Sequence, residues 1–97
     1  MIKLTIKTST KPDKKLMAIF TNKEGVKKIV HFGAKGMDDY TITKDKEQRK
    51  RYRDRHKKDL ETKDPMKPGY LSYYILWGDS ISRKENIEKY KKRFKFN

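Results

Sequence analysis

The densest group of chemically active side chains is the run of cations at residues 49–58. Its sequence is Arg-Lys-Arg-Tyr-Arg-Asp-Arg-His-Lys-Lys, so eight of its ten residues are Lys, Arg or His. Guanidinium groups bind two phosphate oxygens at once, and each neutralised phosphate releases a counterion. The run therefore predicts contact with a polyanion through Arg49, Arg51, Arg53, Arg55, Lys57 and Lys58. The alternative interpretation is a solvated helix whose charges partly cancel, for example through Asp54 and Lys58 at i,i+4.

Two smaller groups extend this prediction. Lys91, Lys92 and Arg93 form a second basic patch, and Lys35 lies within Gly33-Ala34-Lys35-Gly36. Backbone N–H groups around a lysine can form an anion-binding nest, but the spacing fits neither a Walker loop nor a dinucleotide fingerprint. The simpler interpretation is a turn in which the glycines supply positive φ.

The acidic residues and histidines give little support to catalysis. Asp38 and Asp39 invite a metal-dependent nuclease hypothesis, but neighbours on a strand point in opposite directions. We expect one of them to cap a turn and the other to pair with an arginine of residues 49–58. His31 and His56, without any cysteine, form no zinc pattern, and we expect both to be hydrogen-bonded structural residues. We predict no cofactor, no metal and no enzymatic activity.

The elements that must position these residues begin with strands. Ile2, Leu4 and Ile6 alternate with polar residues, which is typical of a half-buried strand. Residues 16–21 and 26–32 are rich in β-formers and flank Asn22-Lys23-Glu24-Gly25, a sequence typical of a hairpin loop. These patterns predict an antiparallel three-stranded meander. Residues 37–42 are expected to form a short strand or an ordered loop.

The second half of the chain is predicted to be helical. Asp45 is expected to cap a helix, with Gln48 in the reciprocal position, that runs to about Asp59; Pro65 and Pro68 interrupt the chain after it. Residues 69–77 suit a buried strand or a short helix, with helix slightly favoured. Residues 82–85 form a capping box for a last helix ending near residue 94, with Ile87, Tyr90 and Phe94 on its apolar side. If exposed, Tyr70, Tyr73, Tyr74 and Trp77 would stack on bases or fill a protein interface. The favoured interpretation is that they are core aromatics, with one or two rings left at the surface.

The composition sets the limits of this prediction. The chain has 97 residues and a net charge of +14, with 27 Lys and Arg against 13 Asp and Glu. This length suits a single small basic domain, with a β-rich half at 1–44 and a helical half at 45–97. The two halves carry +6 and +8, so the charge belongs to the folded body. The absence of cysteine suits a reducing compartment, and we expect no signal peptide, no membrane partner and no secretion.

Four segments, taken in their order along the chain, carry a resemblance to a known family: residues 31–41, 51–56, 74–78 and 87–94. Over about residues 15–96 the sequence resembles an uncharacterised family of small basic proteins encoded by giant nucleocytoplasmic large DNA viruses. The resemblance implies no known activity and transfers no catalytic residue. It implies a viral source, and therefore a place in the virion, or in the virus factory of the host cytoplasm.

The sequence thus predicts an α+β protein in which the three-stranded meander packs with two or three C-terminal helices. The predicted function is non-enzymatic binding of nucleic-acid phosphates with little sequence specificity, and the viral resemblance favours DNA over RNA. The alternative is a minor capsid or structural protein of the virion that assembles with capsid proteins by bridging acidic surfaces.

Overall fold

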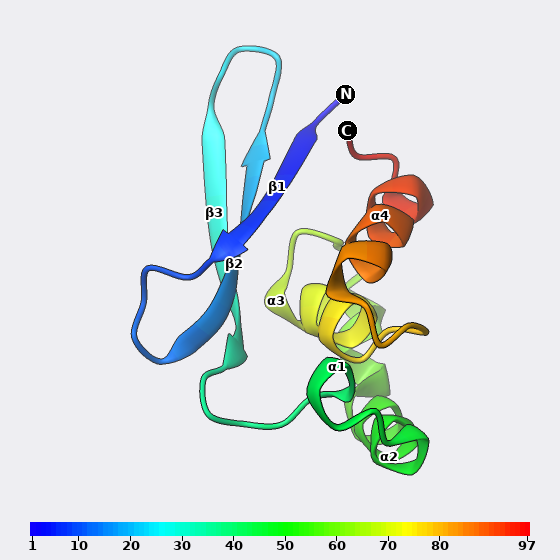
Figure 1. Ribbon diagram of the computed structural model, residues 1–97. Coiled ribbons are helices and arrows are strands. Elements are labelled where there is room, and N and C mark those ends of the chain that lie inside the picture. Colours follow the sequence, from blue (N-terminus) through cyan, green and yellow to red (C-terminus); the bar gives the residue numbers. More distant parts are fainter.

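The computed structural model describes residues 1–97 and consists of an antiparallel sheet with helices packed along one side of it (Figure 1). The strands lie in the order β1-β2-β3, which is the predicted meander: β1 (Lys3–Thr8), β2 (Lys14–Thr21) and β3 (Lys27–Ala34). The α+β fold class is therefore confirmed. The helical part has more pieces than predicted: α1 (Tyr40–Thr43), α2 (Lys46–His56), the 3-10 helix η1 (Lys57–Thr62), α3 (Pro68–Leu71), the π-helix η2 (Ser72–Leu76) and α4 (Arg83–Phe94).

The strand register gathers the apolar residues on one face of the sheet. Leu4 lies opposite Phe20, and Leu16 lies opposite Phe32, so alternation along each strand places these side chains together. The sheet contributes four members of the 11-residue core, Leu4, Ala18, Phe20 and Phe32. The predicted hairpin is confirmed, with Gly25 at φ 81°.

The helices contribute the rest of the core. It comes mainly from the segment predicted as strand or helix, which is helical: Tyr70, Leu71, Ile75, Leu76 and Trp77 are all buried there. Tyr73 and Tyr74 are half-buried, as the prediction of one or two rings at the surface required. On α4, Tyr90 is buried between the half-buried Ile87 and Phe94. The C-terminus then returns to the sheet edge (Figure 1), where the Asn97 carbonyl accepts from Leu4 N–H of β1 and Asn97 N–H donates to the carbonyl of Ile2, just before that strand.

The N-cap residues of the two long helices were predicted correctly, but the reciprocal side-chain bonds of the capping boxes were not. Asp45 accepts hydrogen bonds from the Glu47 and Gln48 N–H groups, and Ser82 accepts one from Glu85 N–H. The reciprocal bonds of both boxes were wrong. Gln48 Oε1 accepts the Thr43 hydroxyl, and Ser82 N–H donates to Ser80 Oγ and not to Glu85. The helix also does not run unbroken to residue 59. It tightens into η1 after residue 56.

The prediction for residues 37–42 was wrong for its second half. Residues 40–43 form the short helix α1, whose N-cap is Asp39. Glycines at both ends of the preceding turn, Gly33 at φ 79° and Gly36 at φ 86°, bring the chain from β3 to this helix. Gly33 is also packed tightly, since a Cβ there would lie 2.6 Å from Leu76 Cδ1.

Candidate nucleic-acid interface

Helix α2 turns one flank towards the body of the protein. Gln48, Tyr52 and His56 recur at i+4 spacing and are all half-buried. Tyr52 stacks between two other rings, 4.1 Å from His56 and 4.3 Å from Trp77, measured between ring centroids. Because Trp77 is buried, this column of three rings fixes an otherwise polar helix to the core.

Two of the predicted phosphate ligands also anchor α2. Arg53 Nε donates to the Trp77 carbonyl at 2.8 Å, and its Nη2 lies 3.1 Å from Asp79 Oδ1. Arg49 Nη1 donates to the Asp79 carbonyl at 3.2 Å, and its guanidinium lies 4.6 Å from the Tyr40 ring centroid. The hydrogen bond from Arg53 is the largest influence on Asp79 and holds the pKa of that carboxyl below its usual range. These contacts could not be predicted from sequence, because residues 77–79 are distant along the chain.

The same arginines line a groove on the outer side of α2. The groove has a volume of about 360 Å³ and seven lining residues, five of them cations: Lys46, Arg49, Lys50, Arg53, Asp54, Lys57 and Tyr73. Lys46, Lys50 and Lys57 are exposed and form no ion pair. The Asp54–Lys58 pair of the alternative interpretation is not formed. The groove therefore carries a net charge of +4.

The second predicted patch lies close to this groove across η2. Arg53 Cζ is 5.4 Å from the Tyr73 ring centroid, the Tyr73 and Tyr74 centroids are 5.0 Å apart, and Arg93 Cζ is 4.7 Å from Tyr74. The structure thus forms a row of cation, ring, ring and cation. Of the other two patch residues, Lys92 is exposed and Lys91 is half-buried.

The remaining predicted ligands are placed elsewhere. Arg51 and Lys58 are exposed, away from the groove, and Arg55 lies at the cleft on the opposite flank of α2. Lys35 is exposed and lines a separate hollow together with Lys14. Sequence reasoning missed Lys46, although its i+4 and i+7 spacing to Lys50 and Arg53 was a usable signal. Nothing in the sequence indicated that Tyr73 would face α2.

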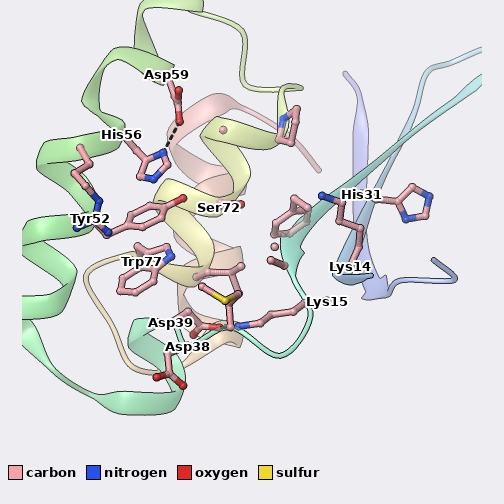
Figure 2. A pocket seen from close by; sticks show the side chains of 18 of the residues that line it. Lys14, Lys15, His31, Asp38, Asp39, Tyr52, His56, Asp59, Ser72 and Trp77 are labelled. Carbon is pink, nitrogen blue, oxygen red and sulfur yellow. Dashed lines mark hydrogen bonds and ion pairs between the residues drawn. The ribbon is translucent and has the colours of Figure 1, made fainter. Parts of the chain in front are cut away.

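The cleft on the other flank separates the end of the sheet from the helices and has a volume of about 620 Å³ (Figure 2). The ring column of Trp77, Tyr52 and His56 forms part of one wall, and Lys14 and His31 lie on the opposite wall. Burial, reinforced by the charge of Asp59, raises the pKa of Tyr52 to about 12 although a hydrogen bond with Ser72 opposes the change, so Tyr52 stays protonated at neutral pH. Both histidines are hydrogen-bonded, as predicted: His31 Nδ1 lies 2.7 Å from Ser9 Oγ, and His56 Nδ1 lies 3.1 Å from Asp59 Oδ2.

The adjacent carboxylates Asp38 and Asp39 have different surroundings. Asp39 is 1% exposed, caps α1 through Thr41 N–H, and pairs with Lys15 at 2.6 Å and Arg83 at 3.1 Å. The prediction that one carboxylate caps a turn is thus confirmed by Asp39, but the prediction that the other pairs with an arginine of residues 49–58 was wrong, and Asp39 itself pairs with Arg83 of α4. Burial raises the pKa of Asp39, but the hydrogen bonds from Lys15 and Thr41 and the charges of Lys15 and Arg83 outweigh it and hold that pKa below its usual range. Asp38 is exposed and has no partner.

The structure holds no group of three or more histidine or carboxylate side chains arranged to bind a metal ion. None of the helices combines the length and the apolar character of a membrane span.

Comparison with known proteins gives one match. Residues 4–56 fit the model of a family described as a family of unknown function (DUF5754). The chain matches no curated protein and no solved structure significantly. The matched segment holds the sheet, Asp39 and all of α2, whereas Tyr73 and the second patch lie outside it. Since the match covers more than half of the chain, the protein belongs to this family of unknown function.

Proposed function

We propose that this protein binds nucleic acid through its phosphates, without catalysis and with little sequence specificity. The observation that carries the proposal is the groove beside α2, where five cations and one carboxylate surround a single hollow. A concave surface of one sign concentrates its field, which attracts polyanions and speeds their capture.

The groove is partly organised before any ligand arrives. Arg49 and Arg53 are held by carbonyls of residues 77–79, so their side chains lose less freedom on binding. Lys46, Lys50 and Lys57 remain mobile point charges, which contact phosphates without reading bases. The combination favours sequence-independent binding.

In this proposal the bound nucleic acid also contacts residues beyond the groove. The row formed by Arg53, Tyr73, Tyr74 and Arg93 leads from α2 towards α4, where Lys92 is also exposed. A strand that followed this row would meet cations at both ends and aromatic rings between them, as in known single-strand surfaces.

The test is the salt dependence of affinity for a mixed-sequence DNA duplex. If the five groove cations neutralise about five phosphates, log K falls with a slope of about 4.5 against log salt. Affinity then drops about 500-fold between about 50 and about 200 mM salt. It should also be nearly equal for unrelated sequences. No binding at low salt, or binding indifferent to salt, would remove the proposal.

A second candidate function is the bridging of acidic protein surfaces in a virion, the setting that the viral resemblance implies. It is supported by the sheet: residues 1–35 carry nine lysines against Asp13 and Glu24, and Val26 and Ile29 are exposed beside them. This surface has no exposed aromatic ring for bases to stack on, which favours a protein partner. It predicts that the protein stays with capsid shells after nuclease treatment and high-salt washes; loss together with the DNA would contradict it.

A further inference from the structure

The cleft on the inner flank of α2 differs in charge from the rest of the molecule. Six ionised side chains line it, three cations and three carboxylates: Lys14, Lys15, Arg55, Asp38, Asp39 and Asp59. Its net charge is therefore zero, in a protein of +14. The groove on the outer flank of the same helix carries +4. Phosphate is therefore attracted more strongly to the groove than to the cleft.

Three of the six charges of the cleft already have a partner. Lys15 pairs with Asp39 at 2.6 Å, and Asp59 pairs with the His56 ring at 3.1 Å. Lys14, Asp38 and Arg55 make no side-chain hydrogen bond or ion pair, and all three line the cleft. The side chains free to meet a ligand are thus one hydrogen-bond acceptor, Asp38 on the 35–39 connection, and two cations, Arg55 on the helix and Lys14 on the sheet.

The cleft has the size of a small-molecule site and one rigid wall. The cleft volume of about 620 Å³ lies in the range of small-molecule sites. One wall is rigid, because the Trp77 and Tyr52 rings stack with an interplanar angle of 8° and Arg53 holds the Trp77 carbonyl from behind. Figure 2 shows this ring column facing the open space between the helices and the sheet.

We propose that this cleft binds one unpaired nucleobase that carries an exocyclic amino group, with Asp38 accepting the amino hydrogens and Arg55 holding the neighbouring phosphate. The proposal rests on the proposed function, since the base is the neutral part of the polymer that the groove would bind. Carboxylates accept hydrogen bonds from base amino groups, whereas phosphate bears no donor for Asp38. A base inside a duplex cannot enter, so the protein should prefer single strands.

The test uses nucleosides, which have a base but no phosphate. Trp77 is the one tryptophan of the chain and lines the cleft, so its fluorescence reports on this site. Cytidine and adenosine should give a saturable change that is equal at about 50 and about 200 mM salt, unlike groove binding. Uridine, which lacks the amino group, should bind about tenfold more weakly, the effect of one charge-assisted hydrogen bond. In Asp38→Ala the difference between cytidine and uridine should vanish.

Asp38 is exposed, so Asp38→Ala should fold normally, and its affinity for a DNA duplex serves as the internal check. Equal binding of cytidine and uridine to the unchanged protein would overturn the assignment of Asp38. No fluorescence change with any nucleoside, while oligonucleotides still bind in a salt-dependent way, would overturn the base site and leave the groove standing. If neither nucleosides nor oligonucleotides bind, the proposed function is refuted, and the base site that rests on it is refuted as well.

Discussion

Replacing Asp39 with asparagine should destabilise the fold strongly, because this carboxylate neutralises two cations next to the core. Asp39 is 1% exposed, and the Lys15 side chain, at 10%, is almost as deeply buried. Removing one member of a buried pair costs about 3–5 kcal/mol, since the other charge remains without a partner. Arg83 is 36% exposed and adds less than about 1 kcal/mol. We expect a loss of about 3 kcal/mol, because an asparagine side chain can still accept from Thr41 N–H.

Urea unfolding measures this loss directly. With a slope of about 1.5 kcal/mol per molar, the midpoint should fall by about 2 M. The matched control is Asp38→Asn, which removes the same charge from the adjacent, exposed and unpaired residue and should change stability by less than about 0.5 kcal/mol. If both variants lose the same stability, net charge and not the buried pair is responsible, and the argument for Asp39 is refuted.

The same group makes stability depend on pH. The pKa of Asp39 in the folded protein lies below its ordinary value of 3.8, so its contribution is fully present above that pH. The contribution is lost as the pH falls below 3.8 through the folded value. The stability difference between the unchanged protein and Asp39→Asn should therefore shrink in acid.

Three further predictions follow from packing and titration. Gly33→Ala should cost more stability than Gly36→Ala, by about 1 kcal/mol or more in thermal unfolding, because both have positive φ but only Gly33 is crowded by a neighbour. Asn86→Ala should cost about 2–3 kcal/mol in urea unfolding, because the buried amide bonds the carbonyls at the end of η2 and in the following turn; a loss below about 1 kcal/mol would contradict this role. In a pH titration of tyrosinate absorbance, Tyr52 and Tyr90 should ionise above their ordinary pKa of 10.0, because burial is the main effect that raises the pKa of Tyr52 to about 12 and raises that of Tyr90 as well. The part of the folding stability that depends on the protonated hydroxyls of Tyr52 and Tyr90 is fully present below their ordinary pKa of 10.0. It is lost as the pH rises through the pKa values of the folded protein.

The parts of the fold that follow from local rules could be predicted from sequence. Alternating apolar residues indicated the strands, Gly25 marked the hairpin, and Asp45 and Ser82 marked the helix starts. Each of these signals depends on residues within one turn or one strand of each other. The fold class followed from their order along the chain.

The parts that depend on distant contacts could not be predicted. The side chain of Gln48 had a local partner in the predicted capping box, but the packing of α1 offered the Thr43 hydroxyl instead. The groove requires Tyr73 to lie beside α2, and the anchoring of Arg53 requires the carbonyl of Trp77. A run of cations therefore indicated the charge of the site but not its shape, nor that two of its arginines also hold the fold together.

The central claim is that the shape of the groove, and not net charge alone, binds phosphate. The most direct test compares two double variants of equal charge, Lys50→Ala/Lys57→Ala in the groove and Lys3→Ala/Lys7→Ala on the exposed part of β1. We predict that the salt slope for a DNA duplex falls from about 4.5 to about 2.7 in the groove variant and stays near 4.5 in the β1 variant. Equal slopes in the two variants would contradict the claim.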